Sequence, residues 1–147
     1  MDKNKVYLVQ TDTTVGFSSN NDEKLSTVKQ RPTTQKILQT IDSFKTLHKN
    51  TRIPKEFRKR VRNSNKTTFI YPNGESYRVI SKDDKFFPFI SKFKKLYSTS
   101  ANLTGKNFDE EFARENSDII VYTKEGFSEI GSSSIFKISK KKIEKIR

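Results

Sequence analysis

Two cations stand one residue apart in the segment Lys29-Gln30-Arg31-Pro32, at the end of an apolar pattern that fits a helix. If Pro32 forces an extended exit from that helix, the side chains of Lys29 and Arg31 can project to the same side. A guanidinium binds phosphate oxygens as a bidentate fork and an ammonium binds them as a point charge, so the pair suits a phosphate chain. Taken alone, the pair is better explained by two solvated charges at a helix C-terminus, where the helix dipole favours them.

A second polar segment, Ser98–Gly105 (STSANLTG), follows an apolar and basic run. Its short side chains fit a turn, or a cradle in which backbone and hydroxyl groups approach a polar ligand closely. The pair Gly105-Lys106 suggests a Walker A phosphate loop, but that loop requires Gly where Ser100 stands and Ser or Thr where Asn107 stands. We therefore reject a Walker A site.

A third polar segment, Thr11–Gly16 (TDTTVG), follows the first apolar run of the chain. Hydroxyls and a carboxylate at the end of a strand are well placed to hold a small polar substrate. A simple Asx-turn or ST-turn would have the same sequence, and on its own it is the better explanation.

The composition limits the chemistry that the chain can perform. Its 147 residues include no cysteine and one histidine, His48, which excludes disulfides, thiolate chemistry, a Ser-His triad and a histidine-based metal site. The net charge of +13 attracts polyanions such as nucleotides, RNA or anionic membranes, although a lysine-rich solubilising surface explains it equally well. No apolar run approaches the length of a membrane span and the N-terminus lacks a signal peptide, so we expect a soluble cytoplasmic protein with no membrane partner.

The remaining patterns predict the elements that must position these residues. Apolar and β-branched runs indicate a strand over 5–10, a hairpin over 67–80 and strands over 117–123 and 133–139. The spacing of apolar residues predicts five helices, over 23–30, 35–49, 53–61, 86–96 and 107–115. Asp22 is predicted to cap the first helix, residues 11–22 to form a loop, and Lys140–Lys142 to lie on a solvated face. Interleaved strands and helices are typical of an α/β or α+β sheet with helices packed on it.

In combination and in this order, the motifs resemble the Sua5/YrdC/YciO family over nearly the whole chain. The segments that carry the resemblance are TDTTVG, KQRP, an Arg-Val strand at Arg78, STSANLTG and a late Ser-Ser-Ser-Ile strand. The resemblance implies an α/β fold: a YrdC-like twisted mixed sheet with flanking helices and a basic concave cavity, formed by residues 1–147 as a single YrdC-like domain.

The family resemblance also implies an activity. Members join L-threonine, bicarbonate and ATP into threonylcarbamoyl-AMP and release pyrophosphate, and the product supplies the threonylcarbamoyl group of tRNA adenosine 37 (t6A37). This is nucleotidyl transfer, which alignment and charge neutralisation can catalyse without a protein nucleophile. The implied partners are ATP, L-threonine, bicarbonate, Mg²⁺, tRNA or double-stranded RNA, and other t6A-pathway proteins.

Family motifs carry over to this chain residue by residue. Lys29 and Arg31 match the pair that neutralises phosphates, which makes them the catalytic candidates. The resemblance implies a nucleotide-binding set that includes the pair: Lys29, Arg31, Thr68, Ser98, Ser100, Asn102, Ser133 and Ser134. It implies a substrate-binding set: Thr11, Thr13, Arg78 and Ser100, with Arg78 as the clamp for the threonine carboxylate. It assigns no protein ligand to a metal.

The sequence also departs from the family pattern. Gln10 stands where the family has proline, Val15 where it has an aromatic residue, and Thr40 where some members have a substrate-contacting histidine. A turn before the first strand of the 67–80 hairpin and the first family helix are missing. Because these departures fall mainly on the threonine pocket, an alternative stays open: a divergent or non-catalytic paralogue that binds double-stranded RNA, tRNA or a nucleotide.

Overall fold

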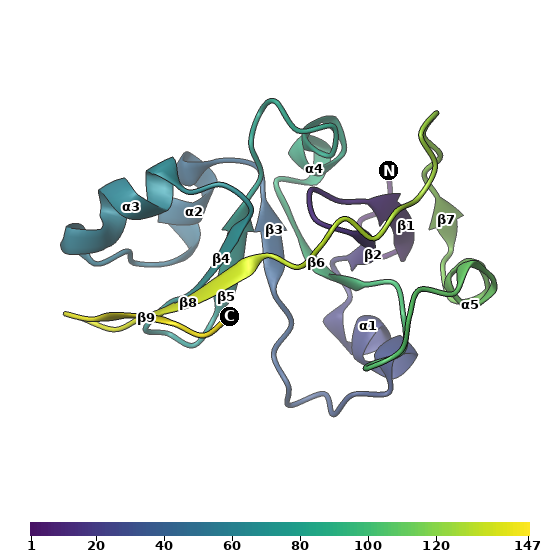
Figure 1. The fold of residues 1–147 in the computed structure, drawn as a ribbon, viewed down its shortest axis with the longest axis horizontal. Helices are drawn as coiled ribbons and strands as arrows, with labels where there is room; N and C mark the ends of the chain where they lie inside the picture. Colours follow the sequence, from purple (N-terminus) through teal and green to yellow (C-terminus); the bar gives the residue numbers. More distant parts are fainter. The chain divides into compact units, whose positions relative to one another are not determined.

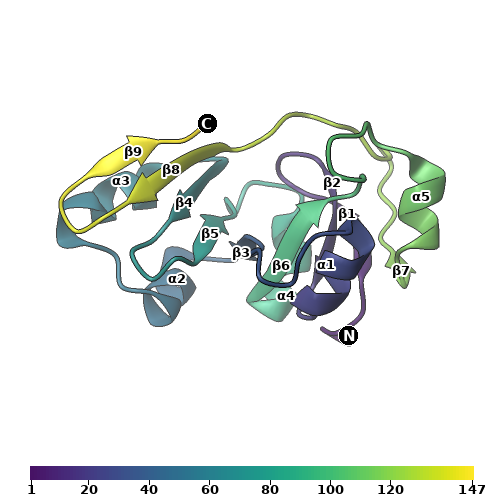
Figure 2. The ribbon, with the colours of Figure 1, turned by 90° about the horizontal axis from the view of Figure 1, so that it is seen from below.

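The computed structural model describes residues 1–147, and the chain divides into two compact units (Figures 1 and 2). The first unit contains residues 1–37 and 96–131, and the second contains residues 38–95 and 132–147. Each unit is a sheet with helices packed on it, so the α/β fold class is confirmed. The single domain and the basic concave cavity stay predictions.

The sheet of the first unit has the strand order β7-β1-β2-β6. Its strands are β1 (Tyr7–Gln10), β2 (Val15–Ser19), β6 (Lys95–Ser100) and β7 (Ile119–Ile120). β2 pairs antiparallel with both β1 and β6, while β7 lies parallel to β1. Helices α1 (Asp22–Lys29) and α5 (Glu110–Glu115) belong to the same unit.

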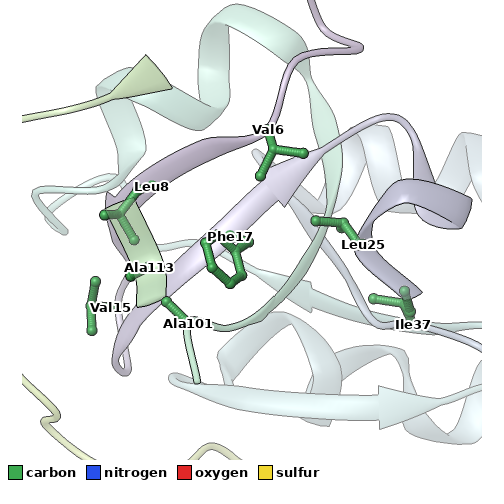
Figure 3. Close-up of a cluster of buried hydrophobic side chains, with 8 residues drawn as sticks. All are labelled: Val6, Leu8, Val15, Phe17, Leu25, Ile37, Ala101 and Ala113. Atoms are coloured by element: carbon green, nitrogen blue, oxygen red, sulfur yellow. The ribbon is translucent and has the colours of Figure 1, made fainter. Parts of the chain in front are cut away.

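The core of the first unit lies between its sheet and these two helices. Phe17 of β2 lies among Leu25 of α1, Ala113 of α5 and the side chains of the strands (Figure 3). Phe17, Leu25 and Ala113 are fully buried. Burying such side chains stabilises the fold by roughly 1.5–3 kcal/mol for each large apolar residue.

The sheet of the second unit has the strand order β3-β5-β4-β8-β9. Its strands are β3 (Gln39–Ile41), β4 (Thr67–Ile70), β5 (Ser76–Val79), β8 (Ser134–Ile138) and β9 (Ile143–Lys145). The helices are α2 (Phe44–Asn50), the 3₁₀ turn η1 (Lys55–Phe57), α3 (Arg58–Asn63) and α4 (Phe87–Phe93). Leu47 of α2 and Val61 of α3 pack in one cluster with Ile41, Phe69 and Tyr77 of the strands.

Local sequence signals explain the elements that the sequence predicts correctly. Strand 5–10, the helices at α1, α4 and α5, and the late strands are all confirmed, although several are shorter than predicted. The hairpin closes with a bond from Gly74 N–H to Tyr71 O of 2.8 Å, and Gly74 has φ 85°. That geometry is a type I turn followed by a left-handed glycine, which Pro72-Asn73-Gly74 favours.

Three predictions of local structure are wrong. Residues 15–19, predicted to be loop, form the buried central strand β2, because pairing on both sides satisfies its backbone. The helix predicted over 35–49 begins only at Phe44, since Gln39–Ile41 forms β3 beside β5 and Ser43 caps the helix. The cap of α1 is Asn21, whose Oδ1 accepts from Lys24 N–H at 3.1 Å, and not Asp22.

Gly16 lies in β2 because a side chain there would collide with β6. A Cβ atom built on Gly16 lies 2.8 Å from the carbonyl oxygen of Thr99. We expect Gly16→Ala to lower the free energy of unfolding by about 1–3 kcal/mol, as in other overpacked sites. Urea denaturation checks this. Gly105→Ala is the comparison for backbone strain without a collision, because Gly105 has φ +77° and nothing lies within 4 Å of a built Cβ. A Gly16→Ala protein as stable as the wild type would show that the contact with Thr99 is not the reason for glycine at this position.

No helix in the structure combines the length and apolar character needed to cross a membrane.

Candidate functional site

The C-terminus of α1 turns sharply between Lys29 and Arg31. Gln30 adopts the left-handed conformation, with φ 55° and ψ 40°. The N–H of Arg31 bonds to the carbonyl of Ser26 at 2.9 Å and the N–H of Gln30 to that of Thr27 at 3.1 Å, which is the Schellman pattern of helix ends. The left-handed residue, and not Pro32 as the sequence suggested, sets the directions of the two cations.

Lys29 is buried, with 2% of its surface exposed, and its ammonium points into the segment after β6. Its Nζ donates to the carbonyl oxygens of Ser100, at 2.9 Å, and of Asn102. Ser100 Oγ and Asn102 Oδ1 each lie 3.4 Å from the same nitrogen. The ammonium is therefore held by four oxygens from the SANLTG segment, which fixes the position of that segment.

Arg31 reaches the same segment two residues further on. Its Nε donates to Thr104 Oγ1 at 3.3 Å, and the residue is half-buried. Asn102 Nδ2 donates to the carbonyls of Leu103, at 2.9 Å, and Lys106, at 2.6 Å, so the amide also closes its own loop. Thr104 therefore belongs to the site, although it was not among the predicted residues. Its position two residues after Asn102 in the same segment could have identified it. We call Lys29, Arg31, Ser100, Asn102 and Thr104 the Lys29 cluster.

Burial, and secondarily the charge of Arg31, lower the pKa of Lys29 to about 8. Removal from water disfavours the charged amine, and a second cation nearby acts in the same direction. Because this pKa lies above 7, the ammonium still predominates at neutral pH, and it donates hydrogen bonds to the carbonyl oxygens around Nζ. The cluster therefore combines an ammonium with a pKa of about 8 and the guanidinium of Arg31 beside it.

This pKa predicts a pH dependence of stability. Between the folded value of about 8 and the ordinary value of 10.5, the unfolded chain binds more protons at Lys29 than the folded chain. Stability must therefore rise with pH across that window. We compare the free energy of unfolding of the wild type with that of Lys29→Met. Between pH 8 and 10.5, the difference between the two proteins is expected to change by about 1–3 kcal/mol in favour of the wild type. Urea titrations at several pH values measure it, and a constant difference between the two proteins would contradict it.

Ser98 and Ser100 lie in β6, and not in a turn as the sequence allowed. Ser98 pairs with Ser18 and Ser100 with Gly16 of β2. Ser98 is buried, with 4% of its surface exposed, whereas Ser100 is partly exposed at the end of the strand. Of the two, Ser100 contacts Lys29, so Ser98 lies in the strand next to the cluster and not in it.

The segment TDTTVG begins with a tight turn. Thr11 Oγ1 accepts from the backbone N–H of Thr13, at 3.3 Å, and of Thr14, at 3.2 Å, and donates to the carbonyl of Thr14 at 2.5 Å. This is the ST-turn that the sequence offered as the simpler explanation. The hydroxyl of Thr13 lies 3.4 Å from that of Thr11, and both residues are buried. A substrate would have to bind Thr11 by replacing one of these bonds.

A second group of predicted residues meets in the second unit. Thr40 pairs with Arg78 between β3 and β5, and Arg78 Nη1 donates to Thr68 Oγ1 at 3.5 Å. Thr68 Oγ1 lies 2.8 Å from Ser133 Oγ. Thr40, Thr68, Arg78 and Ser133 are all buried, and we call these four residues the Arg78 row. Their neighbours Ile41, Phe69 and Tyr77 alternate with them and pack in the apolar cluster, so the row occupies the other face of this sheet.

Ser134 and Arg147 complete the surroundings of the row. Ser134 begins β8 and is exposed. Arg147, which sequence reasoning missed, donates to the carbonyl of Ser133 through Nε at 3.2 Å and Nη2 at 3.1 Å. The two bonds fix the backbone that carries the Ser133 hydroxyl. No motif signalled Arg147, because a carbonyl acceptor can belong to any residue.

The structure therefore brings some of the predicted residues together, in one group within each unit: Lys29, Arg31, Ser100 and Asn102 in the first, and Thr68, Arg78 and Ser133 in the second. Thr11, Thr13, Ser98 and Ser134 belong to neither group. No group of three or more His, Cys, Asp or Glu residues in it could hold a metal ion.

The arrangement of elements is found in proteins of known structure. Sua5 from P. abyssi, solved with L-threonine, matches with a TM-score of 0.80 and 19% identity over 97% of this chain and 50% of the Sua5 chain. YciO from E. coli matches with a TM-score of 0.74 and 16% identity over 99% of this chain and 83% of its own. The chain has the Sua5/YciO fold. Full-length HypF in a phosphate- and nucleotide-bound form also matches, with a TM-score of 0.72 and 13% identity over 97% of this chain and 26% of HypF.

The Sua5/YciO fold confirms the fold that the sequence resemblance implies. No family sequence model matches the chain, and no curated protein sequence is significantly similar to it. The chain spans about half the length of the Sua5 structures, 50% and 52%. The likeness establishes the fold, while the activity has to be inferred from the residues.

Proposed function

We propose that the chain is an L-threonylcarbamoyladenylate synthase-like enzyme, which forms threonylcarbamoyl-AMP and pyrophosphate from ATP, L-threonine and bicarbonate for t6A37 modification of tRNA. The observation that carries the proposal is the meeting of Lys29 and Arg31 with the SANLTG segment in one cluster. The likeness to a Sua5 structure complexed with L-threonine and to nucleotide-bound HypF supports it.

The proposed mechanism needs no protein nucleophile. The amine of threonine reacts with bicarbonate to form a carbamate and water. A carbamate oxygen then attacks the α-phosphate of ATP and displaces pyrophosphate. Arg31 offers a fork that binds two phosphate oxygens, and Lys29 adds a point charge. Together they neutralise the charge that develops on the leaving pyrophosphate, and preorganised donors of this kind supply most of the acceleration in such reactions.

Arg78 is proposed to bind the carboxylate of threonine. A buried guanidinium, 3% exposed, binds a carboxylate far more strongly than a solvated one does, because little water competes. Thr68, Ser133 and Ser134 are proposed to contact the nucleotide, and Thr11 and Thr13 the threonine. These roles are carried over from the family motifs.

Mg²⁺ is proposed to arrive with the nucleotide. The chain offers no group of three His, Asp or Glu residues for a resident ion, so the fit to a protein-held metal is poor. Triphosphate oxygens are hard ligands that Mg²⁺ prefers, and the ion normally keeps several waters. No step of the mechanism above is assigned to it.

The test is release of pyrophosphate from ATP by the purified chain with Mg²⁺. The proposed enzyme must release pyrophosphate only when both threonine and bicarbonate are present, and threonylcarbamoyl-AMP must be identified by mass spectrometry. Release without threonine would indicate simple ATP hydrolysis. Absence of release under all conditions would overturn the enzyme proposal.

A second candidate is a nucleotide-binding module without chemistry. The observation that favours it is that Lys29 already donates hydrogen bonds to two loop carbonyl oxygens, which leaves fewer N–H groups to bind a phosphate. Such a module would bind ATP by titration with no effect of threonine, and would release no pyrophosphate. The enzyme requires tighter ATP binding in the presence of threonine.

A further inference from the structure

The positive charge of the chain is concentrated in α2, η1 and α3. Residues 44–66 contain nine Lys and Arg residues and one acidic residue, Glu56. With nine cations and one anion, this segment has a net charge of +8, out of +13 for the whole chain. The nine cations are Lys45, Lys49, Arg52, Lys55, Arg58, Lys59, Arg60, Arg62 and Lys66. Like charges at this density repel one another, so the concentration of charge is itself unfavourable for the fold.

Helices α2 and α3 border an open groove of about 450 Å³. Its lining consists of two rings and four cations: Phe44, Lys45, His48, Lys49, Arg58 and Arg62. The rings of Phe44 and His48 stack with centroids 6.2 Å apart and an interplanar angle of 16°. The guanidinium of Arg62 lies 4.8 Å from the centre of the Phe44 ring.

The lining holds cations that the fold does not use. Arg58 is engaged, since its Nε donates to the carbonyl of Ile53 at 3.1 Å. Lys45, Lys49 and His48 are exposed on α2, and no carboxylate lines the groove. An aromatic ring can stack on a nucleic-acid base, and the surrounding cations can bind the phosphates on either side of that base.

We propose that this groove binds an unpaired nucleotide of a nucleic-acid strand, with its base stacked on His48 and the flanking phosphates bound by Lys45, Lys49 and Arg62. The groove volume of about 450 Å³ leaves room for a nucleotide. Cations and rings recognise phosphates and bases, so ribose and deoxyribose strands are expected to bind alike.

The pattern of exposed residues separates a nucleic acid from a membrane surface. Peripheral membrane helices insert large apolar side chains beside their basic face. The exposed large apolar residues of this chain are Met1, Ile119, Tyr122, Ile130 and Ile146, and none of them lies within 44–66. A strand with regularly spaced phosphates is therefore the better complement to this surface.

The groove is separate from the proposed catalytic residues. It contains no residue of the Lys29 cluster, which belongs to the first unit. Within the second unit, α2 and α3 pack on the apolar face of the sheet, opposite the face that carries the Arg78 row. The inference consequently stands or falls independently of threonylcarbamoyl-AMP synthesis.

Fluorescence anisotropy with a labelled oligouridylate of about twelve nucleotides tests the groove, since single-strand sites commonly span 4–16 nucleotides. Lys45→Glu/Lys49→Glu is expected to weaken binding by about tenfold or more and to reduce the salt slope by about 1.4, which is 0.7 for each lost phosphate contact. The matched control is Lys140→Glu/Lys141→Glu, which makes the same charge change at exposed residues elsewhere in the second unit. The control is expected to bind within about threefold of the wild type.

His48→Ala separates stacking from charge. It is expected to weaken binding by about fivefold or more, as loss of a base-stacking ring does, with an unchanged thermal midpoint because His48 is exposed. Equal weakening by both double variants would overturn the proposal, since net charge alone would then explain binding. Three further results would also overturn it. The first is a His48→Ala protein that binds the oligonucleotide as the wild type does, and the second is equal affinity for duplex RNA. The third is binding to phosphatidylserine vesicles without binding to the oligonucleotide.

Discussion

Replacing Arg31 by alanine is expected to weaken ATP binding by about 30- to 150-fold, which corresponds to about 2–3 kcal/mol. Arg31 offers a fork that can bind two phosphate oxygens, and its Nε bond to Thr104 orients that fork over the SANLTG segment. Because Lys29 is occupied by the oxygens of Ser100 and Asn102, the larger share of phosphate binding falls to Arg31. Isothermal titration with Mg-ATP, with and without threonine, measures the loss.

Two variants make the Arg31 experiment specific. Lys124→Ala removes one exposed cation from the same unit and is expected to leave ATP affinity within about twofold, since exposed charges are screened. Arg31→Lys keeps the charge but not the fork, so an intermediate affinity is expected. If Arg31→Ala bound ATP as the wild type does, Arg31 would not belong to the nucleotide site.

Elements with strong local signals could be predicted from the sequence. Pro72-Asn73-Gly74 determines a tight turn by its own backbone preferences, and Pro88 fits the first turn of α4, where its missing N–H has no helical partner. The apolar residues of α1 recur with a helical period and a basic residue ends the helix. In each case, the residues that decide the structure are neighbours in the sequence.

The strand β2 could not be predicted in this way. Its residues VGFSS combine Val and Phe, which favour strands, with Gly and two Ser, which are typical of turns. They form a strand because β1 and β6 provide backbone partners on both sides, and Gly16 permits the close approach of Thr99. Both partner strands lie outside the segment. Gly16 of β2 pairs with Ser100 of β6, which lies roughly eighty residues further along the sequence.

The segments that meet at Lys29 were predictable from motif order, but their contacts were not. Motif order suggested that Lys29 and Arg31 belong with the SANLTG segment, and the structure brings Lys29 to Ser100 and Asn102 and brings Arg31 to Thr104. The left-handed Gln30 and the carbonyl acceptors around Lys29 are backbone features, which residue types do not specify. The same reason explains why Arg147, a donor to the carbonyl of Ser133, was missed.

Replacing Arg78 by methionine is expected to lower kcat/KM for threonine by about 100-fold, mainly through a higher KM. The buried guanidinium is proposed to bind the substrate carboxylate, and methionine keeps the apolar stem but supplies no donor. Threonine bound without this partner would leave its carboxylate poorly satisfied at a buried position, which is strongly unfavourable. Initial rates of pyrophosphate release at varied threonine concentration measure the effect, with ATP and bicarbonate saturating.

Arg78 also donates to Thr68, so a structural role has to be separated from substrate binding. Thr68→Val removes the acceptor hydroxyl while Arg78 remains, and it is expected to lower stability without a comparable rise in KM for threonine. Arg78→Lys restores a cation and should recover part of the threonine affinity, whereas a purely structural arginine would give no such recovery. An Arg78→Met enzyme with a normal KM for threonine and a reduced kcat would show that the guanidinium does not hold the carboxylate. A lower kcat at constant KM is expected when a smaller fraction of the enzyme is folded and active.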